Sequence, residues 1–243
     1  MKKWGLVVLA GLLSTTAMAG INIPSNGSDG QLYVTSNTQI DLSQAITSAW
    51  DTDNSANAGK GVYDSNKWAV VFHYTNVYVA SGATVTFKNH PSRAPVVWLV
   101  GGDVTIDGTV SLDGKACVST APWIAEPGPG GFRGGIGERG SAAPGAGFGP
   151  GGGASNGEGG SYGLGPKPYG NLSALPLIGG SGGGGNEHRS RSGGGGGGAI
   201  LIGCSQAITI AGVVQANGGD GNGTGGGSGG AIRLVSESLL GSG

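Results

Sequence analysis

The chain repeats itself after 104 residues, and this repeat limits the folds that it can adopt. The segment 105–114, TIDGTVSLDG, aligns with the segment 209–218, TIAGVVQANG, and an apolar run precedes each copy. A third apolar run, GAIRL at 230–234, repeats GAILI at 198–202 at an offset of 32 residues. Units of this kind cannot bury their apolar faces alone, so they stack on one another. The repeat therefore predicts equivalent strands in successive layers.

Within the repeat, apolar residues alternate with polar or small ones, as Val104, Ile106, Val110 and Leu112 show. A period of two is typical of strands, and glycine, Asp or Asn marks each strand end, where a corner favours positive φ. The pattern predicts further strands over 32–35, 68–72, 76–79 and 84–87. It also predicts one short helix over 41–50, with Asp41 as its N-cap.

A glycine-rich segment at 121–198 needs its own physical account, because it holds 31 of the 56 glycines. Fixing a glycine costs roughly 0.5–1 kcal/mol more than fixing an alanine, so ordering the segment costs about 15–30 kcal/mol. Either the segment stays flexible, as glycine-rich linkers do, or a regular pattern of lateral hydrogen bonds offsets this cost.

The positions of the glycines favour the ordered alternative. They fall at every third residue from 128 to 140, and the runs 182–185 and 193–198 have no side chain on any face. Three residues per turn is the period of the polyproline II helix, and a bare face lets another backbone approach. The segment also carries large residues that linkers seldom have: Trp123, Phe132, Phe148, Tyr162, Tyr169 and Ile178. It therefore predicts glycine helices of the polyproline II type packed side by side.

Together these patterns predict an all-β fold. Its core is a right-handed parallel β-helix of stacked coils, with a polyglycine II helix bundle inserted between the coils. A β-sandwich with the glycine-rich segment as a loop is the alternative. The predicted organisation is a signal peptide at 1–19, N-terminal coils at 20–117, the glycine-rich insertion at 118–198 and returning coils at 199–243. The last coil stops close to where the next strand would begin, which predicts further repeats in a longer chain.

The N-terminus predicts export from the cytoplasm. Residues 1–19 combine a basic start, an apolar stretch at 4–13 and the small residues Ala17 and Ala19 before the cleavage point, as in secretory signal peptides. No later segment is apolar over the length of a transmembrane helix. We therefore expect a secreted protein that is extracellular, at the cell surface or periplasmic. In such an oxidising compartment, Cys117 and Cys204 form a disulfide or remain as two free thiols.

Charge and motifs exclude several functions. The formal net charge of −1 gives no electrostatic basis for binding nucleic acid. The segment 51–55 resembles the start of a calcium loop, but Ala56 occupies the position where that loop needs glycine. His73, His90 and His188 have no partner at metal-ligand spacing, and no nucleophile motif occurs. We predict no catalytic residue, metal or cofactor. Asp103, Asp107 and Asp113 alternate with apolar residues and so predict an outward, solvated face.

The order of segments carries a resemblance. A signal peptide, the strand-rich run VVWLVGGDVTIDGTV, a long glycine insertion and the return GGGGGGAILI resemble secreted bacterial β-helix surface proteins of unassigned function. The glycine-rich segment is similar to the polyglycine II bundles of phage tail-fibre tip adhesins and of certain receptor ectodomains. The second resemblance implies a rigid platform whose connecting loops bind a receptor.

A polar loop interrupts the two pure glycine runs and is the candidate binding site. Its residues are Asn186, Glu187, His188, Arg189 and Arg191, and Trp123, Tyr162 and Tyr169 supply rings that could stack on sugars. A solvated turn that only keeps the protein soluble is the alternative. The sequence predicts a non-enzymatic adhesion or glycan-recognition protein whose partner is a cell-surface or extracellular glycan. A polysaccharide-degrading β-helix enzyme, lyase or hydrolase, and a purely structural module of a larger surface protein are the alternatives.

Overall fold

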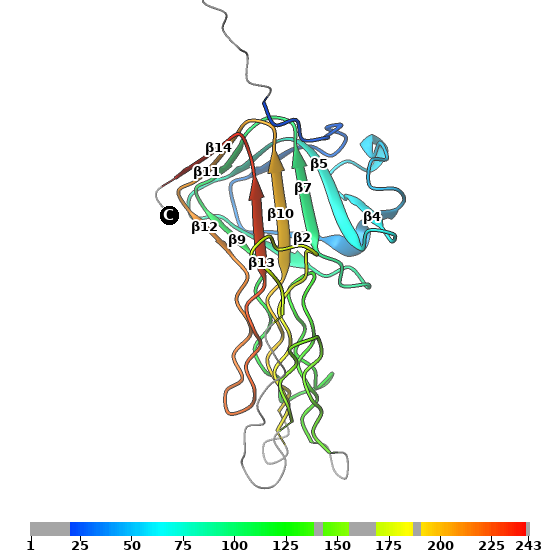
Figure 1. Cartoon of the computed structure of the whole chain (residues 1–243), viewed down its shortest axis with the longest axis vertical. Coiled ribbons are helices and arrows are strands. Elements are labelled where there is room, and N and C mark those ends of the chain that lie inside the picture. Colours follow the sequence, from blue (N-terminus) through cyan, green and yellow to red (C-terminus); the bar gives the residue numbers. More distant parts are fainter. Residues whose placement is uncertain (1–19, 139–142, 156–168, 187–190, 242–243) are drawn as a thin grey trace, which may run out of the picture.

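The structure is a computed structural model of the 243-residue chain, and it describes residues 20–138, 143–155, 169–186 and 191–241. The predicted signal peptide at 1–19 lies outside the described residues. The strands gather in one part of the molecule, which we call the barrel, and extended glycine-rich chains run away from it side by side as a stem (Figure 1).

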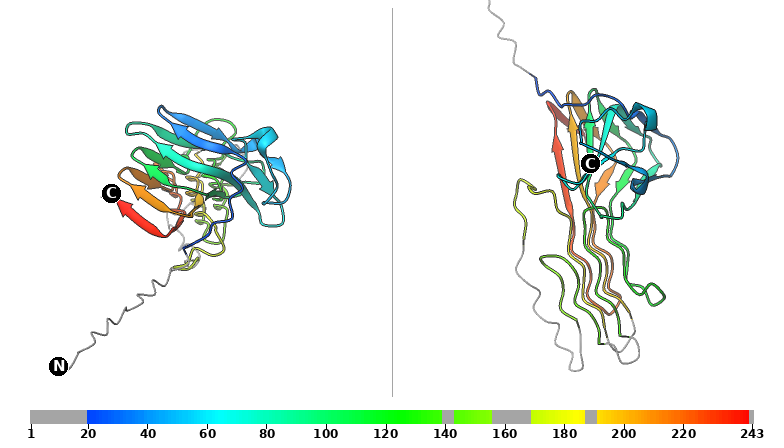
Figure 2. Two further views of the ribbon diagram at one scale, coloured as in Figure 1. Left: turned by 90° about the horizontal axis from the view of Figure 1, so that it is seen from above. Right: turned by 90° about the vertical axis from the view of Figure 1, so that its right-hand side faces the viewer.

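Two sheets build the barrel. The larger has ten strands, and its main path follows β13 (Ala231–Val235), β10 (Ala199–Cys204), β7 (Val96–Val100), β5 (Ala69–Val79), β8 (Val104–Ile106), β11 (Ala207–Ile210) and β14 (Ser238–Gly241). Off this path, β1 (Gly30–Val34) and β4 (Val62–Asp64) pair with β5, and β3 (Ile46–Thr47) pairs with β4. The smaller sheet orders β12 (Val213–Gln215), β9 (Thr109–Ser111), β6 (Thr84–Lys88) and β2 (Thr38–Asp41). Figure 2 shows the strands of the barrel from above and from the side.

The pairing register follows the sequence repeat. In parallel ladders, β10 pairs Ile200 with Val96 and β11 pairs Thr209 with Thr105, each at the offset of 104 residues. Strand β13 pairs with β10 at the shorter offset, which places Ala231 beside Ala199. The two copies of the repeat therefore lie in neighbouring layers, residue beside residue.

The core lies between the two sheets. Strands from both contribute fully buried side chains, among them Phe72, Trp98, Ile106, Val110 and Ile200. Around β8 and β9 the alternating residues Asp103, Asp107 and Asp113 are exposed or half-buried, as the sequence pattern predicts. On β5 and β7 the alternating residues Val71 and Leu99 are instead buried in a second, smaller apolar cluster. Burying such apolar surface contributes roughly 25 cal/mol per Å², so the alternation accounts for which face of each strand turns inward.

The predicted fold class, a right-handed parallel β-helix with an inserted polyglycine II bundle, is wrong. The strands form a mostly parallel, curled half-barrel with a second parallel sheet. Strand β5 explains the difference. The segment 69–79 contains no glycine to make a corner, so the two strands expected at 68–72 and 76–79 are one strand. That strand pairs with both β7 and β8, and β4 adds to it in the antiparallel direction.

The predicted helix over 41–50 is also wrong. Only Leu42–Gln44 form a short 3₁₀ turn, and the Asp41 side chain caps it by accepting from the Ser43 backbone N–H. Ala45 then takes an extended conformation, and Ile46 in β3 pairs with Val62 in β4. Sheet pairing therefore overrides the helical spacing after a single turn. The N-cap assignment to Asp41 is confirmed for this shorter element.

Hydrogen bonds between neighbouring chains hold the stem together. The Gly196 N–H donates to the Phe132 carbonyl, Gly180 N–H to Gly197, and Gly194 N–H to Gly225, at 2.8–2.9 Å. The runs 179–185 and 193–198 are almost entirely buried, because other chains surround them. Residues 216–230 also run within the stem, beyond the end of the predicted insertion at 198. Their backbone groups thus pair laterally instead of facing water.

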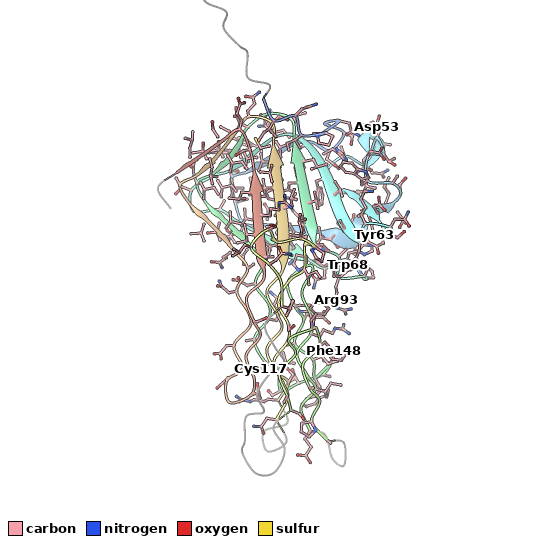
Figure 3. All side chains as sticks on the ribbon, in the orientation of Figure 1. Asp53, Tyr63, Trp68, Arg93, Cys117 and Phe148 are labelled. Carbon is pink, nitrogen blue, oxygen red and sulfur yellow. The ribbon has the colours of Figure 1, made fainter. Side chains whose placement is uncertain are left out.

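The disulfide between Cys117 and Cys204 is not formed, and both thiols are free. Cys204 ends β10 beside Val100, and its buried thiol donates to the Gly102 carbonyl at 2.8 Å. Cys117 is half-buried in the stem, where its backbone N–H donates to the Asp220 carbonyl (Figure 3). The sequence places each cysteine near a strand edge, but the chain leaves the barrel before Cys117 and so separates the two.

Native protein is expected to react with a maleimide at Cys117 and not at Cys204. Burial raises the pKa of the Cys204 thiol, and the thiol is enclosed, so its reactive thiolate is scarce. Mass spectrometry of labelled protein, without reductant, should find one adduct before and two adducts after denaturation. The Cys117→Ser variant should show no adduct in the native state. Two unreactive cysteines that become reactive only after reduction would contradict the structure.

Candidate functional site

Two predicted binding residues lie together at the end of the stem that is farthest from the barrel, which we call the tip. Asn186 and Arg191 form an antiparallel bridge, and the Asn186 N–H donates to the Arg191 carbonyl at 3.2 Å. A second turn meets this bridge: Asn186 Nδ2 donates to the Gly223 carbonyl at 3.1 Å, and Arg191 Nη1 to the Asn222 carbonyl at 3.2 Å. Glu187, His188 and Arg189 lie outside the described residues.

The two residues differ in what they leave free for a ligand. Asn186 is 6% exposed, and its amide is used to join the two turns, so its role is structural. Arg191 is half-buried, and one of its five N–H donors makes the bond to Asn222. Its other donors have no partner among the residues that the structure describes. Arg191 therefore has donors that a ligand could use.

Trp123 belongs to a loop that starts at the same end of the stem. The Val118 N–H donates to the Ser192 hydroxyl at 2.9 Å, and the Ser192 N–H donates to the Val118 carbonyl at 3.0 Å. From there the chain turns, with the Trp123 N–H donating to the Thr120 carbonyl at 2.8 Å. Trp123 is half-buried and has positive φ, 62°. Its backbone is thus held in the turn that leaves the tip.

Tyr169 is not part of the tip. Its hydroxyl donates to the Gly179 carbonyl at 2.7 Å and accepts from the Ser181 hydroxyl at 2.9 Å. Gly179 in turn bonds to Gly130, next to the barrel. Tyr169 lines a mainly apolar cavity of about 730 Å³ together with Asn171, Leu175, Ile178 and other residues. Tyr162 lies outside the described residues, so the tip brings together only part of the predicted set.

A groove where the stem joins the barrel was not predicted from the sequence. We call it the root groove; it encloses about 640 Å³ between the outer face of β2 and β6 and the first stem chains. Figure 3 places Arg93 at this junction. Polar side chains from both walls line it, including Gln39, Thr86, Arg93, Asp113, Lys115 and Glu126.

Glu126 organises the charges of the root groove. It pairs with Arg93 Nε at 3.2 Å and with Arg133, whose Nε lies at 2.7 Å. Burial alone would raise the pKa of Glu126, but hydrogen bonds from Arg133 and Arg93 outweigh it and lower the pKa below its usual range. At neutral pH the carboxylate is therefore ionised and paired with the two arginines. A group held in this way is poorly suited to donate a proton as a general acid.

Asp113 and His90, two other titratable groups of the groove, also have contacts within the protein. Asp113 accepts from Gln215 Nε2 at 2.5 Å and from the Asn217 N–H at 2.7 Å. His90 lies 4.1 Å from the Tyr63 ring, centroid to centroid, and burial lowers the pKa of its imidazole. The groove can therefore form hydrogen bonds with a polar ligand. The contacts of Asp113 and His90 within the protein suit ligand binding better than proton transfer.

No local motif marks this groove in the sequence. Arg93 and Glu126 are 33 residues apart, and they meet because the Gly130 N–H bonds to the Arg93 carbonyl and brings the stem chain back to the barrel. Gln39 and Thr86 become neighbours through the parallel register of β2 and β6. Both residues lie on the same side of the long glycine runs, and nothing in the sequence around either one indicates that they pair.

No metal centre is found in the part of the chain that the structure describes. There, no three His, Cys, Asp or Glu side chains gather closely enough to hold an ion. The calcium-like segment at 51–55 uses its polar groups locally: Asp53 accepts from the Ser55 N–H at 2.9 Å, and Asn54 donates inward to Asp29. Within the same described residues, every helix is too short or too polar to cross a membrane.

Comparison with known proteins gives no relative. No family model matches the sequence, and no curated protein and no solved structure matches the chain.

Proposed function

We propose that this protein is a secreted or surface-displayed adhesion protein without enzymatic activity. In this proposal it recognises a cell-surface or extracellular glycan through the tip, and the stem holds the tip away from the barrel. The observation that carries the proposal is the guanidinium of Arg191, which bonds to Asn222 and to no other described residue, at the end of a stem of buried, laterally bonded glycine chains.

The packing of the stem supports this role. A binding turn on a flexible linker loses conformational entropy when it binds, whereas a turn on a rigid base does not. Here the glycine chains bond to several neighbours each: Gly195 N–H donates to Lys115, and the Gly195 carbonyl accepts from Gly219. At the tip, Asn186 and Arg191 are both bonded to the turn at 222–223. The turns are therefore presented in one arrangement.

The chemistry at the tip suits a hydroxyl-rich ligand. A guanidinium presents several donors in one plane and bonds well to neighbouring oxygen atoms. The indole of Trp123, in the adjoining loop, can stack on the apolar face of a sugar ring. The root groove provides a second polar surface, in which Glu126 stays ionised and does not act as an acid.

Substituting both arginines of the tip loop tests the proposal. The variant Arg189→Ala with Arg191→Ala is expected to lower binding to a glycan array, or to whole cells, by about tenfold or more, since each donor lost to a polar ligand costs roughly 1 kcal/mol. The matched control is Arg233→Ala, which removes a half-buried arginine from β13 in the barrel. Unchanged binding by a double variant that melts at the temperature of the wild type would refute the role of the tip.

A further inference from the structure

Two tyrosines stack on the outer face of the larger sheet, away from the stem. Tyr33 on β1 is the register partner of Tyr78 on β5, and their rings lie 5.2 Å apart, centroid to centroid, with planes 26° from parallel. Tyr33 is 64% exposed. Among the described strands, β1 pairs only with β5, so Tyr33 lies on an open edge and one face of its ring is uncovered.

A hydrogen-bond donor and an acceptor lie beside the stacked pair. An irregularity in the β1 and β5 pairing leaves Thr75 and Asn76 both exposed, three and two residues before Tyr78. Asn76 Oδ1 accepts from the Asp103 N–H at 2.9 Å, and Asp103 Oδ1 accepts from the Ala207 N–H at 3.2 Å. Among the described residues, Asn76 Nδ2 and Asp103 Oδ2 have no hydrogen-bond partner.

The neighbouring backbone holds the side-chain amide of Asn76 in place. The Asn76 side chain lies over Gly102, where any Cβ would collide with Asn76 Oδ1 and the Thr75 carbonyl. The Gly102 N–H also donates to the Thr75 carbonyl at 2.8 Å. Asn76 is thus fixed by its contacts rather than free to rotate in solvent, and its unused N–H donors keep one direction.

We propose that this face of the barrel binds a neutral glycan, with one sugar ring stacked on the uncovered face of Tyr33. Aromatic rings bind flat apolar faces, which pyranose rings offer, and amide and carboxylate groups bond to their hydroxyls. Residues two apart on a strand are roughly 7 Å apart and neighbouring strands about 4.8 Å apart, so Asn76 and Asp103 lie within reach of a short oligosaccharide on the tyrosines.

Stabilisation of the sheet does not account for this arrangement. A cross-strand aromatic pair contributes roughly 0.2–1 kcal/mol to a sheet, but it needs no exposed donor and acceptor beside it.

The negative charge of this face favours a neutral ligand over an acidic one. Asp103 and Asp107 flank β8, one directly before it and one directly after it, and two carboxylates disfavour an acidic sugar. The face is separate from the tip and does not depend on the proposed function of the stem.

Affinity electrophoresis of the whole protein tests the proposal. Gels contain hydroxyethyl cellulose, galactomannan, dextran or, as the acidic polymer, polygalacturonate. At least one neutral polymer should retard the wild type, and polygalacturonate should not. Tyr33→Ala should weaken that retardation by about tenfold, which corresponds to about 1.4 kcal/mol, whereas Tyr33→Phe keeps the ring and should retain most of it.

Two controls separate this face from other surfaces. Leu240→Ala removes an exposed side chain from the same sheet at β14, 56% exposed, and should bind as the wild type does. The tip variant Arg189→Ala with Arg191→Ala should also be retarded normally. No retardation of the wild type by any neutral gel, equal retardation by polygalacturonate, or wild-type retardation of a folded Tyr33→Ala variant would each overturn the proposal.

Discussion

Replacing Gly196 by alanine is expected to lower the melting temperature by about 10 °C, because it adds a methyl group where no space exists. A Cβ at this position would collide with the Gly180 carbonyl and with the backbone of Ser181 on the neighbouring chain. Overpacking of this kind costs about 3 kcal/mol at the upper end of its usual range, and in a domain of this size each kcal/mol shifts the melting temperature by roughly 2–4 °C. Thermal unfolding followed by circular dichroism measures the effect.

The stem itself offers a matched control. A Cβ on Gly229 would have as its nearest neighbour the Ala216 carbonyl oxygen at 3.7 Å, an ordinary contact, and Gly229 is exposed. Gly229→Ala is therefore expected to change stability little, or to raise it by roughly 0.4–1 kcal/mol by restricting the unfolded chain. Equal melting temperatures for Gly196→Ala and Gly229→Ala would show that the central glycine chain is not enclosed as the structure has it.

The positions of the glycines in the sequence predict which chains lie at the centre of the stem. The runs 182–185 and 193–198 have no side chains, and these residues are the ones that other chains surround. Lateral bonding follows from that pattern, because a buried backbone group without a partner is costly. The participation of 216–230 could not be predicted from the glycine-rich segment alone, since these residues follow strands β10, β11 and β12 along the chain and then return to bond with it, as Gly225 does with Gly194.

For the barrel, the sequence predicts pairing better than shape. The repeat identifies which strands are neighbours, and the register of Thr209 with Thr105 follows from it directly. The curled half-barrel depends on β5, where one continuous strand replaces an expected corner. The only sequence feature that indicates this is the lack of a glycine between 69 and 79, which is weak evidence for a continuous strand. The root groove is harder still, because Arg93 and Glu126 meet only through the return of the stem chain.

His73 shows the same limit for polar residues in the core. Its place in a strand indicates a structural histidine, and the ring is buried, with Nε2 at 2.6 Å from the Trp50 carbonyl and Nδ1 accepting from the Asn26 N–H at 3.3 Å. These contacts fit a neutral imidazole that donates from Nε2. The partners come from segments 23 and 47 residues away, so the environment of His73 could not be predicted from neighbouring residues.

Asp29, which no sequence pattern singled out, is expected to be the most sensitive side chain of the barrel. It is 4% exposed and accepts four hydrogen bonds. Oδ1 accepts from Asn54 Nδ2 at 2.9 Å and from the Gly59 and Gly61 N–H groups at 3.0 and 3.1 Å, and Oδ2 accepts from the His73 N–H at 2.8 Å. One carboxylate thus fastens the 54–61 loop to β5.

Asp29→Ala removes the acceptor of three backbone N–H groups, those of Gly59, Gly61 and His73, while Asn54 Nδ2 keeps weaker bonds to the Asn57 and Gly61 carbonyls. Each buried donor left unpaired costs about 1–3 kcal/mol, more when its partner was charged, although neighbouring terms do not add fully. We expect the free energy of unfolding to fall by about 4 kcal/mol, measured by guanidinium denaturation. Because Lys60 is exposed in the fastened loop, trypsin should also cut after it faster in the variant than in the wild type.

Asp53→Ala is the matched control for this prediction. Asp53 lies in the same region at the surface of the barrel (Figure 3), where it is exposed and accepts from the Ser55 N–H. That N–H regains a water partner once the carboxylate is removed, so the loss of stability should stay within about 1 kcal/mol. Equal stability and equal cleavage at Lys60 for the two variants would mean that Asp29 does not fasten the loop. A large loss for Asp29→Ala with unchanged cleavage would instead locate its contribution in the bond to His73.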